Sequence, residues 1–137
     1  MVLVLIYVDD IVITGNDNLL LDKFTKNLNS CFSLKDMGQL HYFLDIEVYR
    51  DSTGLYLTQS KYAADLLRKL ELEHMKPCIT PMSVGKPLLV TNGKALENPK
   101  TYRSALGSLQ YLLLTSPDLA YTVNKLSQFQ QSPTDLH

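Results

Sequence analysis

The first fifteen residues constrain the fold more than any other part of the chain. Residues 1–7 are almost all β-branched or large aliphatic, which predicts a strand buried on both faces. Residues 11–14 predict a second strand that ends at Gly15. Because so few residues separate these strands, they are expected to pair as a β-hairpin, with Asp9 and Asp10 at or beside its tight turn.

The next elements follow from hydrophobic spacing. Apolar residues at helical intervals predict an amphipathic helix over 18–32, with candidate caps at 16–18. Residues 41–50 alternate as one strand, and residues 51–54 are turn-formers that lead into a strand over 55–59. These two strands predict a second hairpin.

The rest of the chain is predicted to form helices on either side of a loop-rich segment. Ser60 is expected to cap a helix that runs to about Leu72. Prolines and glycines punctuate residues 76–100, which predicts an extended linker. A third helix follows around residues 102–113, in which Gly107 is expected to mark close packing. The segment Ser116–Asp118 is expected to begin a fourth helix. Taken together, these elements predict an α+β fold, in which antiparallel hairpins pack with a helix and a helical part follows.

Composition limits the classes of function. The chain has 137 residues, 45% of them hydrophobic, which suits one domain with a core. A net charge of -1 gives no overall basic field, so nucleic-acid binding would require a local patch. Cys31 and Cys78 lack the spacing of a zinc site or a disulfide scaffold. The apolar run at residues 1–8 is too short for a membrane span and lacks the marks of a signal peptide, so no membrane role and an intracellular location are expected.

The adjacent aspartates carry the main chemical signal. Two carboxylates at the tip of an apolar hairpin repel each other unless a cation holds them. Mg²⁺ takes oxygen ligands and is completed by substrate phosphates, so Asp9 and Asp10 predict half of a site for phosphoryl or nucleotidyl transfer with Mg²⁺ or Mn²⁺. For the pair alone, a solvent-exposed turn without function is the alternative.

The surrounding sequence adds a resemblance. Tyr7-Val8-Asp9-Asp10 between two apolar strands resembles the catalytic hairpin of reverse transcriptases. Further segments are similar, in the same order, to those that follow this hairpin in copia-type (Ty1/copia) retrotransposon polymerases: 32–38, 42–48, 54–62, 80–82, 102–112 and 117–119. The resemblance implies the carboxyl-terminal palm and thumb part of an RNA-directed DNA polymerase, with a partial palm and first thumb helix over 1–75, a linker over 76–100 and a helical thumb or connection over 101–137.

The resemblance also implies roles for residues around the hairpin. Asp9 and Asp10 would be the catalytic, metal-binding carboxylates, and Tyr7 and Val8 would lie near the primer terminus and the incoming nucleotide. The second hairpin would steady the primer, while a purely structural hairpin is the alternative reading. Its primer-grip-like residues would be Phe43, Leu44, Asp45, Gly54 and Leu55.

The same comparison implies backbone contacts from the helix after this hairpin. Lys61, Arg68 and Lys69, with Lys76 as a further candidate, would touch phosphates of a template–primer duplex. For each of these residues taken singly, the alternative to phosphate contact is a position on a solvated helix face without a binding role.

Two positions depart from the family pattern that the resemblance implies. Asp45 stands where the family usually has glycine, and Ser116 stands where an arginine is common. The family also needs a third aspartate and nucleotide-binding fingers from earlier palm segments, so the chain is expected not to polymerise DNA alone. Two alternatives remain open: a noncatalytic nucleic-acid-binding module, and a protein that self-associates through its apolar strand edges.

Overall fold

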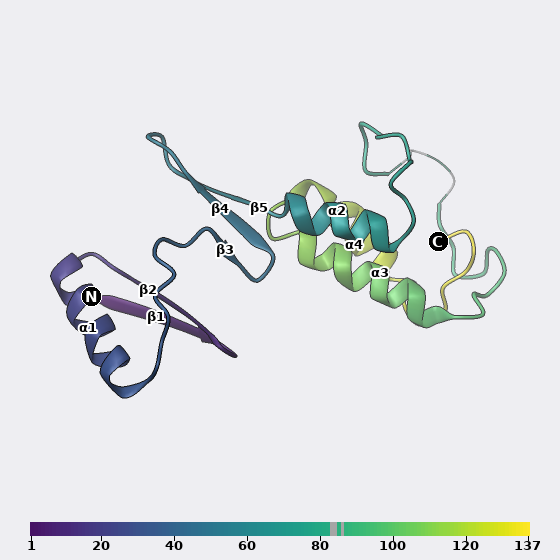
Figure 1. Cartoon of the computed structure of the whole chain (residues 1–137). Helices are drawn as coiled ribbons and strands as arrows, with labels where there is room; N and C mark the ends of the chain where they lie inside the picture. Colours follow the sequence, from purple (N-terminus) through teal and green to yellow (C-terminus); the bar gives the residue numbers. More distant parts are fainter. Residues whose placement is uncertain (83–84, 86) are drawn as a thin grey trace. The chain divides into compact units, whose positions relative to one another are not determined.

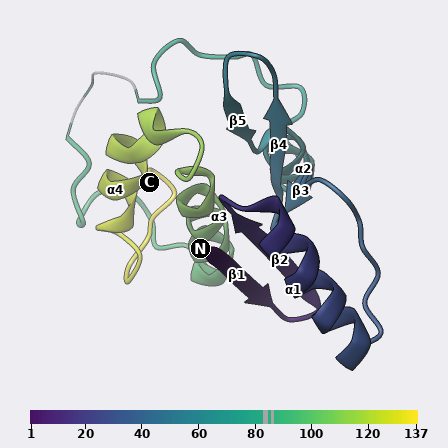
Figure 2. The ribbon, with the colours of Figure 1, turned by 90° about the vertical axis from the view of Figure 1, so that its left-hand side faces the viewer.

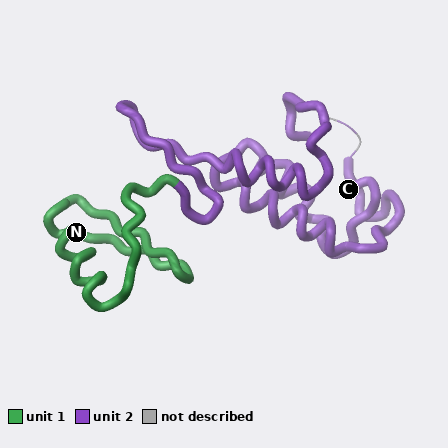
Figure 3. The backbone as a smooth tube through the Cα atoms, in the orientation of Figure 1, with its two compact units in different colours: residues 1–41 green, residues 42–137 purple. Residues whose placement is uncertain are grey.

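The computed structural model describes residues 1–82, 85 and 87–137, which form two compact units, Met1–His41 and Tyr42–His137 (Figure 3). Its small antiparallel sheets and helices confirm the α+β class. Residues 83, 84 and 86 of the expected linker lie outside the described residues.

The first unit consists of a hairpin and a helix (Figure 1). Strands β1 (Val2–Tyr7) and β2 (Asp10–Gly15) pair antiparallel, from Tyr7 opposite Asp10 to Val2 opposite Gly15. Helix α1 (Asn18–Cys31) follows, and the Asp17 side chain caps it by accepting a hydrogen bond from the Leu20 amide at 3.1 Å. The predicted hairpin and helix are therefore confirmed.

The strands of this unit are far less buried than their sequence predicts. Among residues 1–41, all of which the structure describes, none is buried. Leu3 and Leu5 are each 54% exposed and Ile6 is 66% exposed. The expectation of a strand buried on both faces is wrong, because a two-stranded sheet beside a single helix leaves most of the β1 surface uncovered.

The second unit begins with a three-stranded sheet of order β3-β4-β5. Its strands are β3 (Tyr42–Phe43), β4 (Ile46–Arg50) and β5 (Leu55–Thr58). The prediction of one strand over 41–50 is wrong: Leu44 and Asp45 take φ of 48° and 58°, and the chain reverses there. Two successive left-handed residues make the tight turn whose twist suits a hairpin, and aspartate tolerates this conformation.

Three α-helices follow among the described residues, and they lie side by side in Figures 1 and 2. They are α2 (Ser60–Lys69), α3 (Pro99–Leu112) and α4 (Ala120–Ser127), the last preceded by a 3₁₀ turn at Pro117–Leu119. Helix α2 ends three residues before the predicted Leu72. Helix α3 starts inside the expected linker, because the Asn98 side chain caps it by accepting from the Lys100 amide at 3.2 Å.

The buried apolar side chains lie in the second unit: Val48, Leu66, Leu106, Val123 and Phe129. The second half of the expected linker pairs with the last residues of the chain. The Leu96 amide donates to the Pro133 carbonyl at 3.0 Å, and Ala95 forms an antiparallel β-bridge with Thr134. The close packing expected at Gly107 is absent, because a Cβ there would meet no atom of the described chain within 4 Å.

Candidate metal and nucleic-acid sites

The β1–β2 turn presents the two aspartates next to each other. Val8, at φ 49°, and Asp9 form the turn, and Asp10 begins β2 opposite Tyr7. Both carboxylates are exposed. Adjacent carboxylate oxygens fit a hard divalent cation, but the described residues contain no group of three or more metal-ligating side chains. The pair therefore fits as part of a metal site.

The expected primer-grip residues fall into two separate places. Phe43 ends β3, and Leu44 and Asp45 form the β3–β4 turn beside it, at one end of β4. Gly54 and Leu55 lie at the other end of β4, where the chain turns into β5. The structure thus does not bring the five residues together.

The β3–β4 turn is anchored by tyrosines. The Tyr42 hydroxyl donates to the Asp45 carboxylate at 2.6 Å, and this hydrogen bond raises the pKa of Tyr42 to about 12. The Tyr111 hydroxyl of α3 donates to the Leu44 carbonyl. The ring of Tyr62 in α2 meets that of Tyr111 edge to face, with 5.2 Å between centroids. These contacts hold the turn against α2 and α3.

Glu47 of β4 caps helix α2 from outside the helix. Its carboxylate accepts from the Lys61 amide at 2.9 Å and from the Tyr49 hydroxyl at 2.8 Å, and both bonds lower the pKa of Glu47. Gln59, not Ser60, precedes the helix, and its side chain makes no cap bond. The prediction that Ser60 caps the helix is therefore wrong, because the carboxylate of Glu47, 14 residues before Lys61, supplies the cap instead.

The three predicted backbone-contact cations have different surroundings. The Lys61 ammonium lies 5.5 Å from the centroid of the Tyr42 ring. The Arg68 guanidinium pairs with Asp65 at 2.5 Å and Glu73 at 3.3 Å, so its charge is partly compensated. Lys69 pairs with no carboxylate among the described residues and lines a cavity between α2 and α3.

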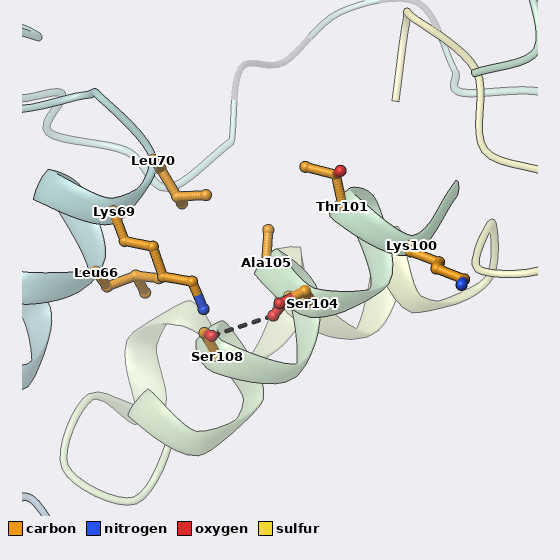
Figure 4. A pocket seen from close by; sticks show the side chains of 8 residues that line it. All are labelled: Leu66, Lys69, Leu70, Lys100, Thr101, Ser104, Ala105 and Ser108. Carbon is orange, nitrogen blue, oxygen red and sulfur yellow. Dashed lines mark hydrogen bonds between the residues drawn. The ribbon is translucent and has the colours of Figure 1, made fainter. Parts of the chain in front are cut away.

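This cavity has a volume of about 330 Å³. Its lining residues, drawn in Figure 4, are Leu66, Lys69, Leu70, Lys100, Thr101, Ser104, Ala105 and Ser108. Sequence reasoning missed Lys100, Thr101 and Ser104, because only the packing of α3 on α2 brings them beside Lys69. A usable signal was present at Asn98-Pro99, a cap and first-turn proline that place Lys100 at a helix start.

Comparisons with known proteins identify the family. The model of the reverse transcriptase (RNA-dependent DNA polymerase) family matches residues 1–84. This chain is 49% identical to the retrovirus-related Pol polyprotein from transposon RE1 of Arabidopsis thaliana. The match extends over 136 residues, which are 99% of this chain and 9% of that polyprotein. The chain is 32% identical to the corresponding polyprotein from transposon TNT 1-94 of Nicotiana tabacum, covering 99% of this chain and 11% of that protein. The chain belongs to the reverse transcriptase family, and its resemblance to the copia-type members is confirmed.

The same comparisons show how much of its relatives' length the chain covers. It spans about a tenth of the length of these polyproteins. An uncharacterized mitochondrial protein of Arabidopsis thaliana is 42% identical over 95% of this chain, which covers 54% of that protein. No solved structure matches the chain. Among the described residues, no helix is both long and apolar enough to cross a membrane.

Proposed function

We propose that this chain is the catalytic-hairpin and thumb portion of a copia-type RNA-directed DNA polymerase. Residues 1–75 serve as a partial palm with the first thumb helix, residues 76–100 as a linker, and residues 101–137 as a thumb or connection segment. The observation that carries the proposal is the exposed β1–β2 turn with two adjacent carboxylates, in a chain of the reverse transcriptase family.

Asp9 and Asp10 hold Mg²⁺ or Mn²⁺ in this proposal. Such an ion, when bound, stabilises the charge that develops on phosphate oxygens during nucleotidyl transfer. Tyr7 and Val8, beside the carboxylates, contact the primer terminus and the incoming deoxynucleotide. The β3–β4 turn steadies the primer strand, and Asp45 does so with its carboxylate engaged by the Tyr42 hydroxyl.

The isolated chain is not an active polymerase in this proposal. No third metal ligand joins Asp9 and Asp10 among the described residues, and phosphoryl-transfer catalysis depends on positioning and charge stabilisation. Purified chain supplied with template–primer, deoxynucleotides and Mg²⁺ or Mn²⁺ is expected to incorporate nothing. Template-dependent primer extension would contradict this.

The metal-binding claim is tested directly with Mn²⁺. Titration of this paramagnetic ion is expected to broaden the amide resonances of Val8, Asp9 and Asp10 first, and the D9N/D10N variant is expected to lose the effect. D22N, which removes an exposed carboxylate of α1, is the matched control. Equal loss in the control, or retained broadening in D9N/D10N, would overturn the proposed metal site.

Self-association is a second candidate function, favoured by the exposure of the apolar β1 side chains. Strand β1 pairs only with β2 in the described sheet, and an unpaired apolar edge is a template for another strand. Sedimentation velocity across a range of concentrations is expected to show oligomers that I6K reduces. A monomer at all concentrations would rule this function out.

A further inference from the structure

We infer that Asn92-Gly93 is a site of spontaneous chemical modification, at which deamidation to isoaspartate opens the neighbouring bridge region, formed by residues 94–96 paired with residues 133–135. Asn92 is the only asparagine in the sequence that glycine follows. Deamidation begins when the main-chain nitrogen of the next residue attacks the asparagine side chain, and a Cβ on that next residue hinders the attack. Glycine has no Cβ, so Asn92 has the least hindered neighbour of any asparagine in the chain.

The fold leaves both reacting groups available. Asn92 and Gly93 are exposed to water. Among the described residues, no hydrogen bond engages the side-chain amide of Asn92 or the main-chain N–H of Gly93. Asn29 offers a contrast, because the residue after it, Ser30, lies inside α1, where main-chain N–H groups donate to the preceding turn. The nucleophile beside Asn92 is therefore free without any local unfolding.

The reaction needs water alone as a co-reactant and involves no oxidation or reduction. The Gly93 nitrogen loses its proton to solvent and bonds to Cγ of Asn92, while the Cγ–Nδ2 bond breaks and ammonia leaves with a proton. The resulting succinimide then adds water at one of its two carbonyls. Addition at Cγ breaks the new bond and yields aspartate. Addition at the main-chain carbonyl breaks the original peptide bond and yields isoaspartate, whose main chain runs through Cβ and Cγ.

The surroundings of Gly93 have no room for a longer main chain. A Cβ built on Gly93 would overlap a carboxylate oxygen of Asp135 and would lie 2.9 Å from Oγ1 of Thr134 and 3.0 Å from Cγ of Leu136. Gly93 also takes φ 88°, a conformation that favours glycine. Isoaspartate at position 92 inserts a methylene into the main chain immediately before this residue. Closely packed atoms transmit such a displacement to their neighbours.

Hydrogen bonds fix the main chain on both sides of the site. Before it, the Asn92 amide donates to the Leu89 carbonyl at 3.0 Å. After it, the Lys94 amide donates to the Asp135 carboxylate at 2.8 Å, and the Asp135 amide donates to the Lys94 carbonyl at 3.0 Å. Because Gly93 lies against Asp135, a shift of Gly93 acts directly on this pair of bonds. The added methylene therefore opens the bridge region.

The first test measures the modification itself. The full chain is incubated at mildly alkaline pH, and products are identified by peptide mapping with mass spectrometry and by methyl transfer from S-adenosylmethionine with a protein isoaspartyl methyltransferase. Asn92 is expected to convert at least about tenfold faster than Asn29, because a correctly placed nucleophile has a high effective concentration. Its rate in the native chain is expected to stay within about tenfold of that in urea, because no hydrogen bond has to open first. N92Q, whose longer side chain disfavours ring closure, is expected to gain no isoaspartate at this position.

The second test measures the bridge region by hydrogen exchange at the amides of Lys94, Leu96 and Asp135. Exchange is expected to be at least about tenfold faster in the isoaspartate-containing chain than in fresh chain. N92Q incubated in the same way is expected to keep the slow exchange. N92D carries the same added charge on a main chain of unchanged length and is expected to exchange like the fresh chain.

Two kinds of result would overturn the inference. Conversion of Asn92 no faster than that of Asn29, or more than about tenfold slower in the native chain than in urea, would show that the fold shields the site. Exchange in the bridge region that stays slow in the isoaspartate-containing chain, or that is equally fast in N92D, would show that the added methylene does not open it.

Discussion

At the scale of single residues, Asp45 shows how a departure from the family pattern fits the fold. The resemblance to copia-type polymerases leads us to expect glycine at this position, and the structure places Asp45 at φ 58° in the β3–β4 turn. Glycine adopts this conformation without cost, and aspartate and asparagine tolerate it better than other residues. The glycine and the aspartate therefore meet the same backbone requirement.

The backbone requirement at position 45 predicts a specific mutational series. D45N keeps a residue that tolerates positive φ but weakens the hydrogen bond from the Tyr42 hydroxyl, so it is expected to lower the free energy of unfolding less than D45V does. D45V is expected to lower it by about 1–3 kcal/mol, because a β-branched residue is strained at positive φ. Urea denaturation followed by circular dichroism measures both. D22V, which replaces an exposed aspartate of α1, is the control. Equal stability of D45V and D45N would contradict the prediction.

The Tyr42–Asp45 hydrogen bond predicts a pH dependence. It raises the folded-state pKa of Tyr42 to about 12, above the ordinary value of about 10. Its contribution to stability is therefore complete below about pH 10 and is lost as the pH rises through about 12. In D45N, the pKa of Tyr42 is expected to fall back toward its ordinary value. Phenolate absorbance, with Y42F subtracted to isolate one of the eight tyrosines, measures the shift. An unchanged midpoint in D45N would contradict it.

At the scale of elements, the start of α2 depends on a residue of another element. Because Glu47 supplies the cap, E47A is expected to lower the free energy of unfolding and to speed hydrogen exchange at the Lys61 amide. The lowered pKa of Glu47 means that this stabilisation is present above the ordinary carboxyl pKa and is lost as the pH falls through the folded-state value. E97A, at an exposed loop position, is the control. Exchange at Lys61 that is equally slow in E47A would contradict the capping role.

Elements with a strong local signal were predictable from the sequence, and those set by distant contacts were not. The apolar pattern and a capping aspartate sufficed for β1, β2 and α1. The turn at Leu44–Asp45 was missed because alternation continues through it and neither residue is glycine. The cavity between α2 and α3 was missed because Lys69 and Lys100 are far apart in the chain, and only helix packing brings them to one cavity.

At the scale of the whole molecule, the two compact units differ in their cores. The buried apolar residues lie in the second unit, whereas none of residues 1–41 is buried. Hydrogen exchange measured by mass spectrometry is expected to show rapid exchange throughout residues 1–41 and protection in β4, α2 and α3. A first unit that is as well protected as the second, at concentrations where the chain is monomeric, would contradict this.

The left-handed turn at Asp45 also has a consequence at the level of codons. Glycine, asparagine and valine codons each differ from an aspartate codon by a single base, yet only the first two encode residues that tolerate positive φ. Homologous sequences in which this hairpin is under selection are therefore expected to carry aspartate, asparagine or glycine here and to lack valine. Homologous sequences that drift without selection would accumulate valine as well, so the residue at this position separates a maintained hairpin from a decaying one.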